Sequence, residues 1–163
     1  MSAADKVIPW DKLPAWRDAL RAAGRKLVAT NGCFDLLHRG HVAYLQSARE
    51  QGDALLVGLN ADASVRNLKG PGRPVQSEDD RAFVLAALAC VDGVCIFREP
   101  TAMKFLEIIR PDVYAKGGDY TIDTINQDER RLIERLGGKV VVLPGVPGQS
   151  TTALLEKILQ TFP

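Results

Sequence analysis

Two histidines, His38 and His41, lie three residues apart where a largely apolar run meets an amphipathic segment. The run, Lys26–Thr30, is typical of a buried strand, and apolar residues recur at helical spacing from His41 onward, so both histidines fall near the start of a helix. That helix end is electropositive, and two imidazoles beside its unpaired N–H groups suit an anion such as phosphate. The alternative is that one histidine caps the helix and the other packs. A ligand site is favoured because both histidines of the chain share one window beside Gly32 and Gly40, where backbone can approach a ligand.

The segments around the histidines alternate between predicted strands and helices. Apolar runs predict further strands at Ala54–Leu59, Val94–Phe97, Asp112–Ala115 and Lys139–Leu143. Amphipathic or capped segments predict helices at Trp10–Ala23, Ser77–Leu88, Ala102–Ile109, Asn126–Leu136 and Thr151–Leu159. This alternation predicts an α/β fold, a Rossmann-like five-stranded parallel sheet with helices on both faces.

The polar motifs of the chain each follow a predicted strand. The histidine segment follows the first strand, Asn60 the second, Lys116–Asp119 the fourth and Gly148–Thr152 the fifth. Because the carboxyl ends of parallel strands meet at one edge of a sheet, we expect a single binding cleft at that edge.

Composition limits the size of the protein and its partners. The 163 residues, 46% of them hydrophobic, predict a single domain over 1–163, with an N-terminal helical extension at 1–24 and a mobile substrate loop at 60–76. A net charge of +1 argues against nucleic acid or a membrane surface as partner. Three cysteines without paired spacing predict neither disulfides nor a zinc site, and no signal peptide or membrane span is evident, so we expect a cytoplasmic protein.

The segment from Asn31 to His41 resembles the H-x-G-H signature of the cytidylyltransferase-like nucleotidyltransferases. Three further segments, Lys69–Val75, Lys116–Tyr120 and Gly148–Thr152, are most similar to the adenylyltransferase half of the bacterial ADP-heptose synthesis enzymes. Four ordered motifs over about residues 25 to 160 are far more specific than one. In many relatives this domain is fused to a sugar kinase, and the lack of a kinase-sized segment here predicts a stand-alone enzyme. Relatives associate as homodimers, which the resemblance implies here as well.

The resemblance implies adenylyl transfer from ATP to D-glycero-β-D-manno-heptose 1-phosphate, which gives ADP-heptose and pyrophosphate for lipopolysaccharide core biosynthesis. In the family, the residues corresponding to His38 and His41 bind the triphosphate and stabilise the transition state. Cys33 beside His38 could suggest a covalent mechanism, but no third group is evident to orient the histidine as a base. The nucleotide is expected to lie beside Asn31, Gly32, Cys33 and Phe34.

The predicted loop at 60–76 carries three cations, Arg66, Lys69 and Arg73. Its closure over the substrates would exclude water and add positive charge where pyrophosphate leaves. Lys69 is the first candidate for a catalytic role and Arg73 the second, and the alternative is a solvated basic loop. Arg81 matches a family arginine near the phosphates, with a surface ion pair to a nearby carboxylate as an equal alternative.

The two remaining motifs supply nucleotide contacts in the family. A strand-end lysine followed by glycines lets the backbone approach a base or ribose, and Asp119 either accepts from ribose hydroxyls or holds the turn. Ser150 is also a candidate helix cap, which is compatible with phosphate binding at the same helix end. The further nucleotide-binding residues expected are Asn60, Arg81, Lys116, Gly117, Gly118, Asp119, Ser150, Thr151 and Thr152.

No metal site is predicted within the protein. Asp35 and Asp62 are the carboxylates nearest the motifs and form no recognisable metal cage, and Asp35 more plausibly holds a turn. Mg²⁺ is therefore expected to enter with ATP, held mainly by the phosphates.

Three rival functions remain open. A cytidylyltransferase acting on glycerol 3-phosphate or ethanolamine phosphate is the alternative within the class, although the glycerol-phosphate enzymes carry an arginine shortly before the Gly148 motif that is missing here. A dinucleotide-dependent oxidoreductase would need G-x-G-x-x-G, and Gly32 and Gly40 lack that spacing. A non-catalytic nucleotide-binding module is the third possibility, and the intact histidine pair argues against it.

Overall fold

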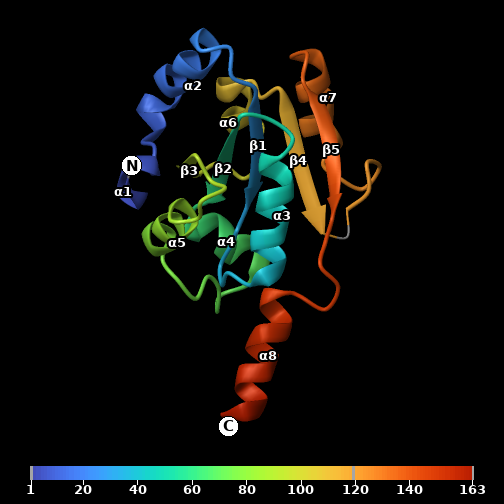
Figure 1. Cartoon of the computed structure of the whole chain (residues 1–163). Coiled ribbons are helices and arrows are strands. Elements are labelled where there is room, and N and C mark those ends of the chain that lie inside the picture. The colour runs from blue at the N-terminus through green and yellow to red at the C-terminus, as the bar shows by residue number, and fades with distance from the viewer. Residues whose placement is uncertain (1, 119, 163) are drawn as a thin grey trace.

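Five parallel strands form the centre of the protein. The computed structural model describes residues 2–118 and 120–162, so the expectations for Asp119 lie outside the described residues. The strands pair in the order β3-β2-β1-β4-β5, which confirms the predicted five-stranded parallel sheet (Figure 1). Their bounds are β1 (Leu27–Gly32), β2 (Ala54–Asn60), β3 (Gly93–Phe97), β4 (Val113–Gly118) and β5 (Lys139–Pro144).

Helices cover both faces of this sheet. On one face pack α2 (Leu13–Ala22), α6 (Met103–Ile109) and α7 (Gln127–Arg135), which share a buried core with Leu27 and Ala29 of β1. On the other face, α3 (Arg39–Arg49) and α5 (Glu78–Ala86) share a core with Val28. Successive side chains of a strand point to opposite faces, so strands covered on both sides read as continuous apolar runs.

The N-terminal segment packs against the sheet rather than extending from it. It consists of α1 (Ala3–Lys6), a short 3₁₀ turn η1 (Trp10–Lys12) and α2. Ile8 is buried and its backbone N–H donates to the Val94 carbonyl of β3 at 2.8 Å. The buried Arg17 of α2 donates to the Ile109 carbonyl, tying this helix to α6. The helix ends before Gly24, whose φ of +65° is the left-handed conformation that glycine favours.

The predicted loop over 60–76 is wrong for its first half, because residues Asp62–Lys69 form helix α4. Glycines and prolines dominate only the second half of the segment, whereas Ser64 and Val65 in the first half are buried. The Asn60 side chain also donates to Ser64 Oγ at 3.0 Å, which joins the end of β2 to this helix. The helix ends at Gly70, where φ is +101°.

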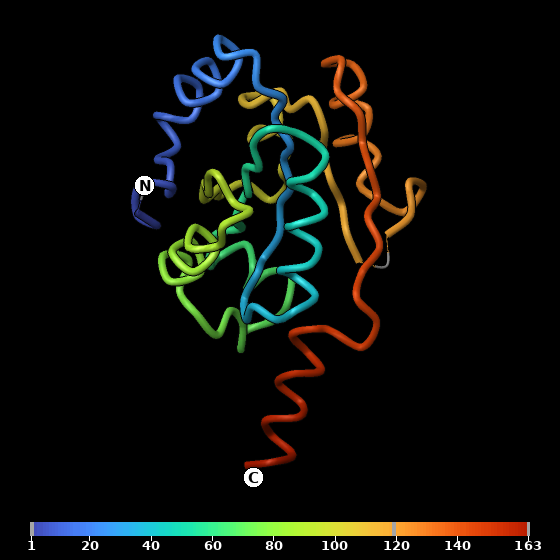
Figure 2. Tube along the Cα trace, in the orientation of Figure 1, coloured from blue at the N-terminus to red at the C-terminus, as the bar shows by residue number. Residues whose placement is uncertain are grey.

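The C-terminal helix α8 (Thr151–Thr161) projects away from the body of the protein (Figures 1 and 2). It contributes no buried residue, and Ile158, Leu159 and Phe162 are exposed in and just after it. Ser150 caps the helix, since its Oγ accepts from the Ala153 N–H, as the sequence predicts. In the described part of the chain, no helix has the length and apolarity that crossing a membrane requires.

Candidate active site

A cleft of about 1020 Å³ opens at the carboxyl ends of the strands. The chain leaves β1 for β2 on one side and β4 for β5 on the other, so β1 and β4 flank the point where the strand order reverses, and ligands bind at such points. The motifs predicted to share one edge of the sheet meet here. The predicted residues that line the cleft are Asn31, Gly32, Cys33, Phe34, His38, His41, Asn60, Lys69, Arg73, Lys116, Gly117, Gly118, Ser150, Thr151 and Thr152.

The two histidines lie against each other at the start of α3. Their ring centroids are 3.9 Å apart, with the planes inclined by 26°. His38 caps the helix, because its Nδ1 accepts from the Gly40 N–H at 3.1 Å. A side chain at position 40 would meet the His38 ring at 2.9 Å, so this position requires glycine. Capping and ligand contact are therefore compatible, since both rings still line the cleft.

Burial favours the neutral form of both imidazoles. Burial lowers the pKa of His41 to about 4, with a further lowering from His38 and a small opposing effect from the Leu36 backbone. Burial also lowers the pKa of His38. Because Nδ1 of His38 accepts a hydrogen bond, the proton of its neutral ring is on Nε2, which makes Nε2 a donor. The buried Nδ1 of His41 has no hydrogen-bond partner of good geometry among the described residues.

The turn between β1 and the histidines is tightly built. Phe34 adopts a φ of +44°, unusual for a residue other than glycine, and its ring lies 5.2 Å from that of His41. A side chain at Gly32 would meet the Phe34 ring at 2.9 Å. Burial raises the pKa of the Cys33 thiol, which argues against a thiolate nucleophile at this position.

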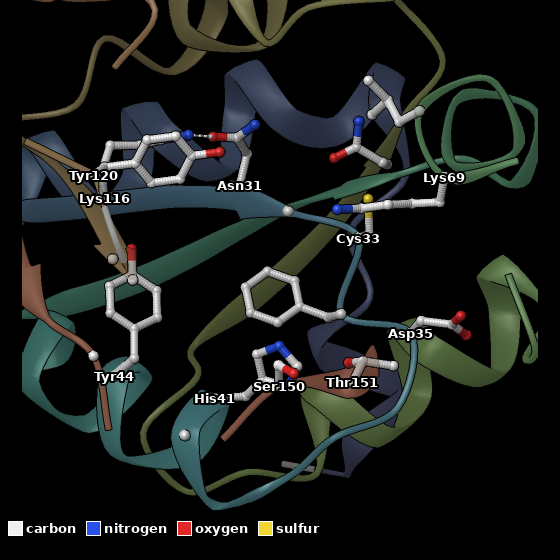
Figure 3. Close-up of a pocket in the computed structure, with 18 of the residues that line it drawn as sticks. Asn31, Cys33, Asp35, His41, Tyr44, Lys69, Lys116, Tyr120, Ser150 and Thr151 are labelled. Carbon is white, nitrogen blue, oxygen red and sulfur yellow. Dashed lines mark hydrogen bonds between the residues drawn. The ribbon is translucent and has the colours of Figure 1, made fainter. Parts of the chain in front are cut away.

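The last residue of α4, Lys69, is the cation of that helix that reaches the cleft. Figure 3 shows its side chain running toward Cys33. Arg66, one turn earlier, is exposed and is absent from the cleft lining, so the structure does not place it with the other predicted substrate-loop cations.

Asp35 holds the segment after α4 against the histidine loop. Its carboxylate, with a side chain only 1% exposed, accepts from the backbone N–H groups of Val75 and Gln76 and from Arg73 Nε at 2.6 Å. These hydrogen bonds hold the pKa of Asp35 below its usual range despite burial. Arg73 thus lines the cleft while its Nε is engaged by a carboxylate. Asp35 holds this distant segment, and not its own turn as the sequence had suggested.

Arg81 lies behind the cleft, and the interpretation of it as a surface ion pair is wrong. Its side chain is fully buried, so it is neither a surface ion pair nor a cleft-lining residue. It pairs with Asp62 at 2.6 Å and donates to the carbonyls of Cys33 and Asn60 at 2.6 and 3.0 Å. One guanidinium therefore ties the ends of β1 and β2 to the start of α4, a role that tertiary structure alone reveals.

At the other side of the cleft, Lys116 is held among polar side chains at the end of β4. Its Nζ donates to Asn31 Oδ1 at 3.0 Å and lies 3.3 Å from the Tyr114 hydroxyl, with the Tyr120 ring 5.6 Å away. Burial lowers the pKa of Lys116, and Glu129 opposes that effect. The next residue, Gly117, has no room for a side chain, because a Cβ there would lie 2.4 Å from the Tyr44 ring.

Sequence reasoning missed Glu129, Tyr114 and Asn126, which belong to the wall beside Lys116. Glu129 and Asn126 line the cleft, and Glu129 is buried although it stands in a strongly charged segment. A signal was present, because Glu129 shares a helical stripe with Leu132 and Ile133, at spacings of three and four, and so lies on the apolar face of α7.

The start of α8 closes the cleft beside the histidines. Figure 3 shows Ser150 and Thr151 next to His41. Thr151 donates to the Leu36 carbonyl at 3.3 Å, which joins this helix to the histidine loop. Two helix N-termini, those of α3 and α8, therefore adjoin the same cleft and favour bound anions there.

The carboxylates near the cleft are engaged by the protein. Asp35 is occupied by Arg73 and two backbone N–H groups, and Asp62 by Arg81. Within 2–118 and 120–162, no three or more His, Cys, Asp or Glu side chains gather as a metal site would require. The chemistry of the described site is thus that of hydrogen-bond donors and cations arranged to hold anionic ligands.

The sequence of this chain is similar to those of known proteins. The chain is 51% identical over 144 residues to the bifunctional protein HldE of Trichlorobacter lovleyi, covering 88% of this chain and 29% of that protein. It is 49% identical over 157 residues to bifunctional protein HldE of Geobacter sulfurreducens, covering 96% and 32%. The chain thus spans about a third of the length of these relatives.

A solved structure and a family model agree with that likeness. The lipopolysaccharide core biosynthesis protein of Thermoplasma volcanium superposes with a TM-score of 0.62 at 30% identity, over 76% of this chain and 98% of that one. The cytidylyltransferase-like family model matches residues 29–157, which include the histidine pair and every cleft motif. The chain therefore belongs to the cytidylyltransferase-like family.

Proposed function

We propose that the protein transfers the adenylyl group of ATP to D-glycero-β-D-manno-heptose 1-phosphate, giving ADP-heptose and pyrophosphate. The observation that carries this proposal is the single cleft in which the histidine pair, Lys69, Lys116 and the start of α8 meet. Identity of about 50% to HldE proteins over nearly the whole chain supports the sugar phosphate as acceptor, and so does the likeness to a lipopolysaccharide core biosynthesis protein.

In the proposed reaction, a phosphate oxygen of the sugar 1-phosphate attacks the α-phosphorus of ATP. The bond from the α-phosphorus to the bridging oxygen breaks, and pyrophosphate leaves with that oxygen. No protein nucleophile is needed, in keeping with the raised pKa of Cys33. The protein holds two anionic reactants in line and offsets the charge that develops on the transferring and leaving groups.

The histidines act in this scheme as neutral hydrogen-bond donors. The lowered pKa values of His38 and His41 favour uncharged rings at neutral pH, so their contribution is directional hydrogen bonding rather than net charge. Positive charge comes instead from Lys69 on one side and Lys116 on the other. This division suits a leaving pyrophosphate, which needs charge stabilisation during the reaction and must still dissociate afterwards.

Magnesium belongs to the substrate in this proposal. Asp35 and Asp62 are engaged by arginines, so neither is free as a metal ligand, and Mg²⁺ enters as its ATP complex. That arrangement agrees with the preference of Mg²⁺ for phosphate oxygens and retained water.

The experiment that tests the proposal measures pyrophosphate release from ATP or CTP with a panel of sugar and polyol phosphates. We expect turnover with ATP and heptose 1-phosphate, and ATP should exceed CTP by a wide margin, because polar groups left unpaired by the wrong base can cost up to ~10⁴-fold. Turnover with CTP and glycerol 3-phosphate, but none with heptose 1-phosphate, would favour the alternative cytidylyltransferase function.

The working form we propose is a cytoplasmic homodimer. The support is the projecting helix α8, whose Ile158 and Leu159 side chains are exposed together with Phe162 just beyond it. A group of exposed apolar side chains is typical of surfaces that contact another protein. Light scattering coupled to size exclusion tests this point, and a monomer at micromolar concentration would contradict it.

A further inference from the structure

A buried carboxylate stands in the wall of the cleft with no part in the reaction described above. Glu129 in the first turn of α7 is 4% exposed, whereas the side chain of its neighbour Asp128 is 77% exposed. Removing a carboxylate from water is costly unless hydrogen bonds and charges compensate. The contacts of Glu129 therefore indicate what the buried charge does.

Both oxygens of Glu129 are held in place. Oε1 accepts from the backbone N–H of Ala102 at 3.1 Å, and Oε2 accepts from the Tyr114 hydroxyl at 2.8 Å. The backbone is held as well, because the Glu129 N–H donates to Oδ1 of Asn126, which caps α7. This carboxylate thus has one position, fixed by α6, α7 and β4 together.

The Tyr114 hydroxyl links Glu129 to two residues that line the cleft, Asn31 and Lys116. It lies 2.5 Å from Asn31 Oδ1 and 3.3 Å from Lys116 Nζ, while Nζ also donates to Asn31 at 3.0 Å. A phenol has one proton, so Tyr114 donates to either Glu129 or Asn31 at a given moment, and its oxygen remains available to accept from Lys116. Lys116 retains one further N–H donor for a ligand, and its side chain lines the cleft.

The charge of Glu129 also favours the protonated form of Lys116. Burial lowers the pKa of Lys116, and Glu129 raises it. Among the residues that the structure describes, the other titratable groups facing Lys116 are Tyr114 and Tyr120, and Tyr44 of α3 packs on the adjacent Gly117. Burial raises the pKa values of Tyr114 and Tyr44, which favours neutral hydroxyls and makes Glu129 the compensating charge within this described set.

We propose that Glu129 is a positioning residue for Lys116: acting through Tyr114, it keeps the partly buried ammonium ion charged and directed at a phosphate group of the bound substrates. The inference rests on the proposed function for the identity of those substrates. Glu129 itself touches no reacting atom in this scheme. Without the buried carboxylate, a lysine in this wall would lose its proton more readily.

The test replaces Glu129 by glutamine, which keeps the shape and removes the charge. The pH midpoint of Lys116 acetylation by trace acetic anhydride, followed by mass spectrometry, reports its protonation without any turnover. We expect Glu129→Gln to lower that midpoint by about one unit, in the range that a nearby opposite charge produces. The basic limb of the kcat/KM profile with ATP and heptose 1-phosphate should move to lower pH by the same amount. Asp128→Asn, which removes an exposed carboxylate from the same helix turn, should change neither quantity.

A second variant separates charge from geometry. Tyr114→Phe keeps the Glu129 charge and removes the hydroxyl that links it to Lys116 and Asn31, so we expect a KM for one substrate raised about tenfold. Reduced activity in Glu129→Gln with an unmoved Lys116 midpoint would mean that Glu129 only supports the fold, and the proposal would be overturned. Parent-like kinetics in folded Tyr114→Phe would overturn it as well, even if Glu129→Gln does not fold.

Failure of the proposed function has a different signature. A parent protein that releases no pyrophosphate from ATP and heptose 1-phosphate contradicts the substrate assignment, while the acetylation midpoints still decide whether Glu129 controls the charge of Lys116.

Discussion

At the histidine side of the cleft, backbone groups position the functional side chains, whereas at the lysine side a chain of buried side chains does so. The His38 ring is oriented by the Gly40 N–H, and burial favours the neutral form of both imidazoles. Lys116 is set by Asn31 and Tyr114, with Glu129 behind them. Figure 3 shows His41 and Lys116 on separate sides of the cleft.

The difference teaches that the two sides are vulnerable in different ways. A helix start provides its N–H groups whatever the side chains are, so the histidine side loses function when the imidazoles themselves are removed. A buried ion depends on its partners for both charge and direction, so the lysine side also loses function when a residue that never meets substrate is changed. Predictions on both sides can break or sharpen this contrast.

The largest effect on turnover is expected on the histidine side. His38→Ala and His41→Ala should each reduce kcat at least about 100-fold, equivalent to about 2.7 kcal/mol of transition-state stabilisation, because each removes a hydrogen-bond donor to developing charge. Pyrophosphate release measures kcat, and circular dichroism confirms that each variant is folded. A folded double variant with near-normal turnover would remove the histidines from the mechanism.

A smaller effect is expected at Lys69, which lies on a helix rather than in a buried network. Lys69→Ala should lower kcat about tenfold or more and leave ATP affinity nearly unchanged, if its charge acts mainly as pyrophosphate leaves. Arg66→Ala is the matched control, because this exposed cation of the same helix does not line the cleft. Equal losses in both variants would indicate a general effect of surface charge instead.

A change in the buried residues beneath the histidine side of the cleft is expected to lower the stability of the fold. Arg81→Met should lower the free energy of unfolding by about 3–5 kcal/mol, because it leaves Asp62 and three backbone carbonyls without their buried partner. Arg98→Met removes an exposed ion pair with Glu78 and should cost no more than about 1 kcal/mol. Urea unfolding compares the two, and similar losses would show that Arg81 does not hold the loop.

A further effect on stability concerns pH. The pKa of His41 is about 4 in the folded protein and about 6.5 when unfolded, so between these values the unfolded chain binds more protons. The contribution of His41 to stability is therefore complete above about pH 6.5 and is lost as the pH falls toward 4. Urea unfolding from pH 7.5 to 4.5 should show a weaker decline in His41→Asn than in the parent. Identical declines would mean that His41 is not held neutral by burial.

Local patterns predicted the elements well where the sheet is buried on both faces. Ala54–Leu59 was expected as a strand and forms most of β2, because a strand covered by helices leaves an uninterrupted apolar run. The first half of 60–76 was misread because short helices with few buried residues carry little periodic signal, and only Ser64 and Val65 are buried in α4.

The features of the site also fall into those that the sequence predicted and those that only the structure revealed. The sequence by itself determined the fold class, the position of the histidines at a helix start and the convergence of the motifs, since strand ends and helix starts are local features that topology then brings to one edge. Only the tertiary structure decided that Arg81 is buried behind the cleft, that Asp35 holds the segment after α4 and that Glu129 stands behind Lys116. The physical reason is that a charged side chain has the same local signature on a surface as in a buried network, and the partners that make its burial possible come from elements far apart in the sequence.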